Sequence, residues 1–419
     1  MGLGLGIGFA ARFVAQQSAA LGRAVEWTAT EVFDPTGQVF LRLLFFVVVP
    51  LTFGLLMLGV VQLGRLSRLG PLAGRTFLLF GVNMAIGVAL GLAIMNVVRP
   101  GTRLAPATRT ALVEQFSAQA RDVQARAAEQ PSLSFKSLVE MFMPRNLLRA
   151  VVDFQLLPLI LFALLAGAAG TQLAEAHRRK LAEGLGILTE LMTRLVHWAM
   201  ELAPYAVAAL MASLVIRTGV DLLKAVLLFV VCVLAGMAIH LFGTMSLMLK
   251  LFSRRSPREF FRATRTILVT AFSTSSSNAT LPTSIQVSRE QLGISASTAG
   301  FVLPLGATMN MSGTALYEGC VVLFVAQVYG VPLSLGSQVT LLVLAVLSAV
   351  AVAGVPGASL PLIVGLLGTF GVPPEGIALI LGVDRILDMT RTVLNVAADV
   401  VTACIVDERQ AVETGGIIP

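Results

Sequence analysis

Charged side chains are scarce in this chain. Asp, Glu, Lys and Arg make up 13% of its 419 residues, whereas hydrophobic residues make up 56% and the mean hydropathy is +0.85. An ordinary soluble domain carries about 25% charged residues. The shortage of charge therefore excludes a soluble globular protein, and the recurring long apolar runs predict an all-α polytopic membrane protein.

Cysteine and histidine are also few. The three cysteines, Cys232, Cys320 and Cys404, lie in apolar segments, which excludes the disulfide framework of a small secreted domain. The three histidines are scattered and lack the spacing of metal ligands. We find no nucleophile with a base partner and no nucleotide-binding loop, so the sequence predicts that the protein is not an enzyme and needs no cofactor.

The net charge of +7 comes from basic loops between apolar segments. Lys and Arg gather at 65–75, 177–180 and 250–265, which are alternate loops. The positive-inside rule places such loops on the cytoplasmic side of a membrane. The basic charge therefore indicates a lipid bilayer as partner and does not indicate nucleic acid.

Six apolar segments in the first part of the chain are candidate membrane helices. The first is shorter than the roughly 20 residues that a spanning helix needs. A polar stretch, 99–145, follows the third and predicts an external loop. The six segments are 1–16, 38–63, 76–98, 146–171, 183–215 and 221–252.

Two later segments, 256–291 and 334–371, are apolar but interrupted midway by small and polar residues. Each predicts a helical hairpin that enters the membrane and returns, because irregular backbone at membrane depth is tolerated only inside protein or beside a cavity. Each is followed by a helix with polar residues near its middle, 296–328 and 374–406. Paired interrupted segments indicate inverted repeats around the binding site of a transporter.

The last of these helices carries a polar stripe. With about 100° between successive residues, Asp384, Asp388, Arg391, Asn395 and Asp399 share one face. A charge at the centre of a membrane helix costs at least about 2.5 kcal/mol, so the stripe must face protein or a water-filled cavity. Two interpretations stay open: the stripe binds a ligand, or Asp388 and Arg391 only pair with each other.

Four motifs occur in order along the second half of the chain. They are SSSNATLP at 275–282, NMSGTALYE at 310–318, GVPGA at 354–358, and the stripe at 384–399. With these motifs the chain resembles the dicarboxylate/amino acid:cation symporters, the glutamate transporter family, over almost its whole length. The resemblance implies an elevator-type fold of eight transmembrane helices plus two re-entrant hairpins. It also implies a homotrimer in the cytoplasmic (inner) membrane of a bacterium or archaeon.

The resemblance divides the chain into a static scaffold and a mobile transport domain. The implied parts are 1–74 (scaffold helices 1 and 2), 75–98 (helix 3 of the transport domain), 99–145 (external loop), 146–216 (scaffold helices 4 and 5), 217–411 (transport domain, with helix 6, hairpin 256–291, helix 7 at 296–328, hairpin 334–371 and helix 8 at 374–406) and 412–419 (cytoplasmic tail).

Matched positions imply roles in substrate binding. Arg391 would hold the side-chain carboxylate of the substrate through a bidentate fork that Lys cannot copy. Asp388 would take the ammonium group, and Asn395 would bind the α-carboxylate. The full set implied to bind substrate is Ser275, Ser276, Ser277, Met311, Thr314, Val355, Gly357, Ala358, Ser359, Asp388, Arg391, Thr392 and Asn395.

The resemblance also implies cation sites and one departure from the family. Ser312 stands where the family has an Asp of a third sodium site, and its helix-3 partners here are Phe80, Asn83 and Met84. Phe and Met supply no oxygen for a hard cation, so we expect the third site to be absent. The two remaining sodium sites would use Gly306, Asn310, Asn395 and Asp399, and Thr308, Met311 and the carbonyls of Ala349, Val350 and Val352.

Glu318 stands where sodium/proton-coupled members have their implied proton carrier. Burial in a low dielectric favours a neutral carboxyl group, which suits that role. The alternative is a glutamic acid that stays protonated and only forms hydrogen bonds. A second arginine of the family is missing, because its two usual positions hold Ser275 and Met389.

These features predict a secondary active symporter of acidic amino acids, glutamate or aspartate, coupled to protons, to sodium or to both. The alternative is a C4-dicarboxylate:cation symporter of the same fold, although a substrate without an ammonium group gains nothing from Asp388. An anion channel would leave the stripe with little purpose. The sequence does not choose between glutamate and aspartate, which differ by one methylene group.

Overall fold

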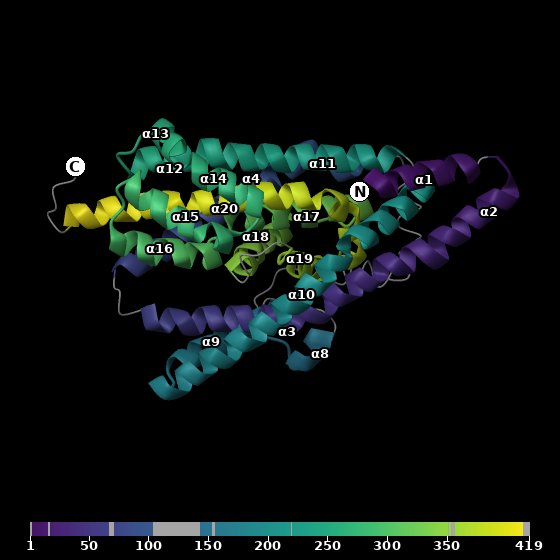
Figure 1. The fold of residues 1–419 in the computed structure, drawn as a ribbon. Coiled ribbons are helices and arrows are strands. Elements are labelled where there is room, and N and C mark those ends of the chain that lie inside the picture. The colour runs from purple at the N-terminus through teal and green to yellow at the C-terminus, as the bar shows by residue number, and fades with distance from the viewer. Residues whose placement is uncertain are drawn as a thin grey trace.

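The computed structural model describes residues 2–15, 17–66, 71–103, 143–152, 156–218, 220–350, 352 and 357–413. Every regular element within these ranges is helical, as the composition predicts (Figure 1). The predicted external loop at 99–145 and the tail at 412–419 lie for the most part outside the described residues.

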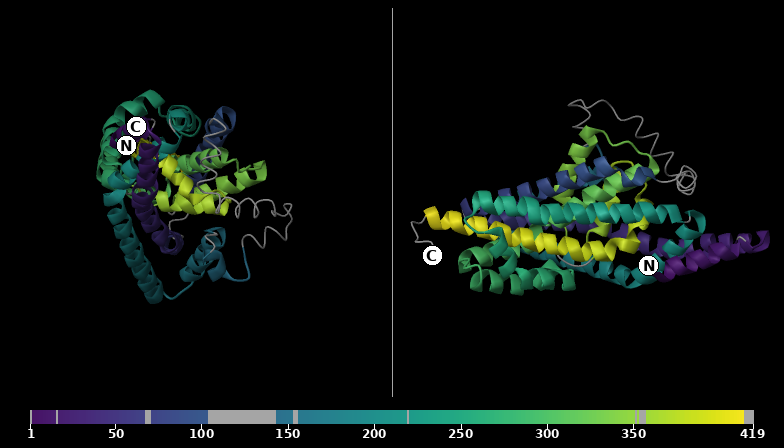
Figure 2. Two further views of the ribbon diagram at one scale, coloured as in Figure 1. Left: turned by 90° about the vertical axis from the view of Figure 1, so that its right-hand side faces the viewer. Right: turned by 90° about the horizontal axis from the view of Figure 1, so that it is seen from above.

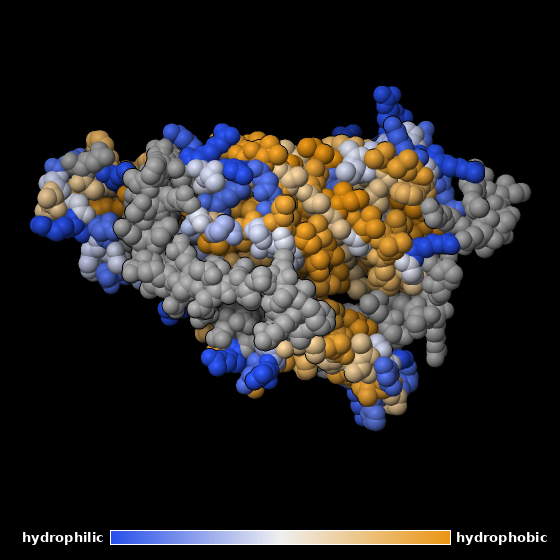
Figure 3. Space-filling model, turned by 180° about the vertical axis from the view of Figure 1, so that it is seen from behind, coloured by the Kyte–Doolittle hydropathy of each residue, from blue (hydrophilic) through white to orange (hydrophobic). Residues whose placement is uncertain are grey.

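Four helical stretches are long and apolar enough to cross a membrane: Ala73–Arg103, Lys224–Phe252, Ala296–Tyr329 and Pro374–Glu408. Shorter apolar helices accompany them. A broad apolar surface covers the middle of one face, with hydrophilic residues toward the ends (Figure 3). Large side chains such as Phe46 and Val97 are 75% and 82% exposed, which suits contact with lipid or another apolar surface. The protein is therefore a multi-pass membrane protein.

The N-terminal helices pack mainly against one another. They are α1 (Gly2–Ala15), α2 (Ala19–Thr28), η1 (Ala29–Phe33), α3 (Asp34–Leu66), α8 (Leu147–Val152), α9 (Leu156–Thr171) and α10 (Glu175–Thr218). Helices α3, α8 and α9 lie at the bottom of Figure 1, whereas α1 and α2 lie at its right-hand end. Helix α3 packs along both α9 and α10. Val47 and Leu51 of α3 meet Met192 and Val196 of α10 in an apolar cluster separate from the main core.

The remaining helices supply most of the main core, to which α3, α9 and α10 also contribute buried residues. These remaining helices are α4 (Pro71–Val98), η3 (Pro100–Arg103), α11 (Val220–Ala238), η4 (Ile239–Thr244), α12 (Met245–Phe252), α13 (Pro257–Ala263), α14 (Arg265–Thr274), α15 (Ser277–Glu290), α16 (Ala296–Met309), α17 (Ser312–Tyr329), α18 (Leu335–Val350), α19 (Leu360–Thr369), η5 (Pro374–Ile377) and α20 (Ala378–Glu413). Helix α17 lies against α4, and a Cβ on Gly91 of α4 would come within 2.8 Å of Cys320 Sγ on α17. Seen from above, the C-terminal end of α20 and the α1–α2 pair lie at opposite ends of the long axis (Figure 2).

The interrupted segments break where the small and polar residues predict. Helix α14 ends at Thr274, and the next residue, Ser275, has a φ of +50°, which is left-handed and strained for a residue with a Cβ. Ser276 then caps α15, because its hydroxyl accepts a hydrogen bond of 3.2 Å from the Ala279 N–H. In the second segment, α18 ends at Val350 and α19 begins at Leu360.

The structure places several helix bounds differently from those predicted. The segment 146–171 contains α8 and α9, between which residues 153–155 lie outside the described residues, and helix 7 at 296–328 is interrupted at Asn310 and Met311 between α16 and α17. Helix α20 begins after a 3₁₀ turn and continues to Glu413, so the predicted tail at 412–419 overlaps a helix end. The short first segment is followed directly by a second helix, α2.

Candidate functional site

The polar stripe of α20 is buried, as predicted. Asp384, Asp388, Arg391, Asn395 and Asp399 are between 2% and 6% exposed. Helices α14, α16 and α17 pack against α20. The stripe therefore faces protein, which is the environment that charged groups at membrane depth require.

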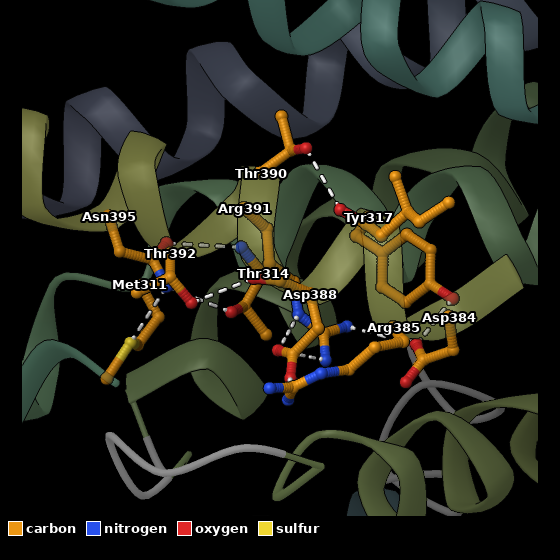
Figure 4. Close-up of polar contacts among 11 residues, drawn as sticks. Met311, Thr314, Tyr317, Asp384, Arg385, Asp388, Thr390, Arg391, Thr392 and Asn395 are labelled. Carbon is orange, nitrogen blue, oxygen red and sulfur yellow. Dashed lines mark hydrogen bonds and ion pairs between the residues drawn. The ribbon is translucent and has the colours of Figure 1, made fainter. Parts of the chain in front are cut away.

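Arg391 lies at the centre of a charged cluster (Figure 4). Its Nε and Nη2 atoms donate to one oxygen of Asp388, at 2.9 and 2.8 Å, and its Nη1 lies 3.7 Å from Asp384. The guanidinium carbon also lies 4.7 Å from the centre of the Tyr317 ring. The Tyr317 hydroxyl donates a hydrogen bond of 2.9 Å to Asp384. The ion pair between Asp388 and Arg391 is thus present, within a larger cluster that holds the guanidinium from several sides.

Asn395 joins α20 to the start of α17. Its Oδ1 accepts hydrogen bonds from the backbone N–H groups of Gly313 and Thr314, at 2.7 and 3.3 Å. Its Nδ2 faces Met311 Sδ and Thr314 Oγ1, each at 3.2 Å. This side chain satisfies the free N–H groups at the start of α17, which explains why a helix can begin again in the middle of the predicted helix 7. The Asn395 amide oxygen therefore already accepts two hydrogen bonds within the protein.

A small cavity lies beside Asp388 and Arg391, and its walls come from the first interrupted segment, the break before α17, the second interrupted segment and α20. Its lining is predominantly polar and includes nine of the thirteen predicted substrate-binding residues. The lining residues are Ser275, Ser277, Met311, Thr314, Val352, Ser359, Asp388, Arg391, Thr392 and Asn395.

Three of the four other predicted substrate-binding residues lie near the same two breaks. Ser276 is buried and caps α15, whose N-terminal N–H groups and positive dipole end favour an anion. Gly357, with a φ of +77°, and Ala358 are buried just before α19. Val355 lies outside the described residues.

Three of the four groups predicted for the first sodium site meet. Asp399 Oδ1 accepts a hydrogen bond of 2.9 Å from Asn310 Nδ2. A Cβ on Gly306 would lie only 2.3 Å from that same carboxylate oxygen, so the backbone of α16 touches Asp399. The Asn310 Oδ1 atom is buried and has no hydrogen-bond partner among the described residues. Asn395 lies one turn before Asp399, but its amide oxygen accepts hydrogen bonds from backbone N–H groups of α17.

The groups predicted for the second sodium site are less clearly assembled. Thr308 is exposed, and its hydroxyl donates to the Leu305 carbonyl at 2.9 Å. Ala349 and Val352 are buried and joined by a backbone hydrogen bond of 3.4 Å, while Val350 is partly exposed. Convergence of these groups on one cation stays a prediction.

Glu318 lies on α17 at its contact with α18 and is fully buried. Its Oε1 accepts a hydrogen bond of 3.2 Å from the Ser348 hydroxyl. Its Oε2 has no hydrogen-bond partner in the described part of the chain. The carboxyl group is thus bonded to the second interrupted segment rather than to the substrate cavity.

Comparison with known proteins places these features in a family. The family model described as "Sodium:dicarboxylate symporter family" matches residues 1–409. The chain belongs to the sodium:dicarboxylate symporter family.

The relatives in this family are transporters, so this symporter is not an enzyme, as its sequence predicts. The chain is 32% identical to a proton/sodium-glutamate symport protein of Geobacillus stearothermophilus, over 90% of this chain and 87% of the relative. It is 30% identical to a proton/glutamate-aspartate symporter of Escherichia coli (strain K12), over 91% and 86%. A C4-dicarboxylate transport protein of Bacillus subtilis (strain 168) is 26% identical, over 90% and 89%.

The four positions at which the family would form a third sodium site are all buried in this symporter. Phe80 and Met84 of α4 belong to the main apolar core. Asn83 and Ser312 are fully buried, and their side-chain polar atoms have no hydrogen-bond partner within the described residues. The absence of a third sodium site stays a prediction.

Tyr317 and Ser348 also belong to the symporter's site, although the sequence did not predict roles for them. Tyr317 bonds to Asp384 and lies under Arg391, and Ser348 bonds to Glu318. Tyr317 lies three residues after Thr314, so both point to the same side of α17. This spacing could have predicted that Tyr317 lies near the site. For Ser348, an isolated serine in an apolar helix, the sequence gave no such signal.

Proposed function

We propose that this symporter carries an acidic amino acid, glutamate or aspartate, across the cytoplasmic membrane of a bacterium or archaeon, driven by protons, sodium or both. The observation that carries the proposal is the cavity with Asp388 and Arg391 side by side in its wall. A substrate with both an ammonium group and a side-chain carboxylate can engage both charges. A purely anionic or a neutral substrate leaves one of them without a partner, and a buried unpaired charge is costly.

Binding requires Arg391 to exchange partners. In the structure two of its nitrogens donate to Asp388. We infer that the substrate's side-chain carboxylate takes over these donors and that Asp388 turns to the substrate ammonium. One buried ion pair is then replaced by two, so that Arg391 and Asp388 each keep a partner of opposite charge. Asp384 and Tyr317 hold the far side of the guanidinium throughout this exchange.

The coupling ions act at separate places. Asp399, Asn310 and the backbone at Gly306 form the better assembled candidate for sodium, because the Asp399 carboxylate lies against both the Asn310 amide and the backbone of α16. Glu318 is the candidate proton carrier, since its carboxyl group is fully buried and accepts a hydrogen bond from Ser348, with no second partner among the described residues. Its position between α17 and α18 would link its protonation to the second predicted hairpin.

The family membership supports further architecture as part of this proposal. It comprises eight transmembrane helices, two re-entrant hairpins at 256–291 and 334–371, inverted repeats and a homotrimer. The scaffold would comprise 1–74 and 146–216, and the transport domain 75–98 and 217–411, moving as an elevator. The extensive packing of α3 against α9 and α10 supports the scaffold assignment.

The second candidate is a C4-dicarboxylate symporter, because a relative at 26% identity carries that description. Labelled glutamate, aspartate and succinate uptake into proteoliposomes tests both. We expect saturable accumulation of an acidic amino acid, with an Arg391→Gln variant inactive. Accumulation of succinate with neither amino acid transported would overturn the proposal.

The driving ion is tested by imposing the gradients one at a time. An inward proton gradient without sodium drives uptake if Glu318 is the coupling group. An inward sodium gradient at equal pH drives it if the Asp399 site is sufficient. Uptake that responds to neither gradient would contradict symport.

A further inference from the structure

Arg385 is a second guanidinium beside Asp388, a residue that lines the substrate cavity. It lies three residues before Asp388 on α20, and its Nη1 is 3.8 Å from Asp388 Oδ2. The Arg385 side chain is 60% exposed, whereas that of Asp388 is 8% exposed. Figure 4 shows the guanidinium groups of Arg385 and Arg391 both beside the Asp388 carboxylate. Arg385 is therefore a long, largely exposed cation beside a buried acidic group.

The two arginines use different oxygens of Asp388. Arg391 donates twice to Oδ1, whereas Arg385 faces Oδ2. With Asp384 and Asp388 ionised, Arg391 alone leaves the cluster with one net negative charge. An acidic amino acid is itself a monoanion at neutral pH, so this cluster would repel it. The charge of Arg385 removes that repulsion.

Among the described residues that line the cavity, Arg391 is the only cation, so the α-carboxylate of the substrate needs Arg385 as its cationic partner. The oxygen of Asn395, the residue implied to bind this group, accepts two N–H groups of α17, and its nitrogen faces Met311 and Thr314. Arg391 is required for the side-chain carboxylate. In an α-amino acid the ammonium and the α-carboxylate are attached to one carbon. A group beside the Asp388 carboxylate is therefore also beside the place of the α-carboxylate.

We propose that Arg385 is a substrate-binding residue that pairs with the α-carboxylate of the acidic amino acid, a role that rests on the proposed function. Before binding, Arg385 lies against Asp388. When the substrate ammonium takes Asp388, the Arg385 side chain turns to the neighbouring carboxylate. The chain thus selects α-amino diacids with two arginines from a single helix, Arg385 and Arg391, one turn on either side of Asp388.

Substrate amides separate this role from a general effect of charge. The probes are aspartate, its α-amide isoasparagine and its β-amide asparagine, as competitors of labelled aspartate uptake. The variants are Arg385→Gln and Arg385→Lys, with Arg265→Gln, an exposed arginine on α14, as matched control. We expect Arg385→Gln to weaken aspartate about tenfold and to leave the α-amide unchanged. Arg385→Lys restores part of the loss, and the control changes nothing.

The ratio of inhibition constants decides the outcome. If Arg385 pairs with the α-carboxylate, the preference for aspartate over its α-amide shrinks in Arg385→Gln while the preference over asparagine persists. Equal weakening of all three compounds would show that Arg385 only neutralises Asp388 and would overturn the proposal. Wild-type protein that takes up no acidic amino acid would instead overturn the proposed function. If glutamate is the better substrate, glutamate and its two amides replace these probes.

Discussion

The hydroxyl of Tyr317 donates a hydrogen bond of 2.9 Å to Asp384, and both groups contact the same guanidinium, that of Arg391. Tyr317 thus packs its ring against the Arg391 guanidinium and also fixes the position of Asp384 through the hydrogen bond. Neither residue lines the substrate cavity. Their effect on transport must pass through the position of Arg391.

We predict that Tyr317→Phe lowers the kcat/KM of acidic amino acid uptake about tenfold. The variant keeps the ring but leaves the buried Asp384 without its donor, which costs about 1–3 kcal/mol. Tyr317→Leu, which also removes the ring, loses more. Tyr329→Phe on the same helix, away from the stripe, is the control. Equal activity of Tyr317→Phe and wild type would show that Asp384 does not need this bond.

Asp388→Asn is expected to lose uptake of acidic amino acids by about 100-fold. The variant removes the partner of the substrate ammonium and leaves Arg391 without its two carboxylate contacts, and hydrogen bonds to charged groups are worth about 1.5–3 kcal/mol each. Competition assays with succinate give a contrasting readout, because a substrate without an ammonium group should lose less. A parallel loss for both compounds would argue against the ammonium role.

For Glu318→Gln we expect uptake that an inward proton gradient no longer drives, while substrate exchange at equal ion concentrations persists. The amide keeps the shape and can accept from the Ser348 hydroxyl, but it cannot carry a proton. Ser348→Ala removes the hydrogen bond and leaves the carboxyl group, so it should retain proton-driven uptake. Proton-driven accumulation by Glu318→Gln at the wild-type level would rule out this carrier.

Gly306→Ala should abolish sodium-dependent uptake. Its Cβ would lie 2.3 Å from Asp399 Oδ1, so the carboxylate would have to move away from Asn310. Gly300→Ala on the same helix is the matched control, because no atom lies within 4 Å of its added Cβ. Thermal melting of the detergent-solubilised variants, with and without sodium, separates a lost ion site from a misfolded protein. Unchanged sodium stimulation of Gly306→Ala would contradict the site.

The stripe of α20 was predictable because helical periodicity alone places its polar residues on one face. Charged groups at membrane depth must then face protein or a water-filled cavity. The two breaks were predictable from runs of serine, glycine and proline. The break at Asn310 was not predicted as a helix end, since it depends on Asn395 from a distant part of the chain capping α17. Likewise, the approach of Arg385 to Asp388 depends on side-chain conformations that the spacing permits but does not require.

Helix α10 has a consequence for the surroundings of the protein. Its 44 residues span about 66 Å, roughly twice the hydrocarbon thickness of a bilayer. A helix of this length can cross only at a steep tilt or with its ends in the aqueous layers. The length of the lipid acyl chains therefore influences how α3, α9 and α10 sit in the membrane, because thin and thick bilayers favour different tilt angles of α10.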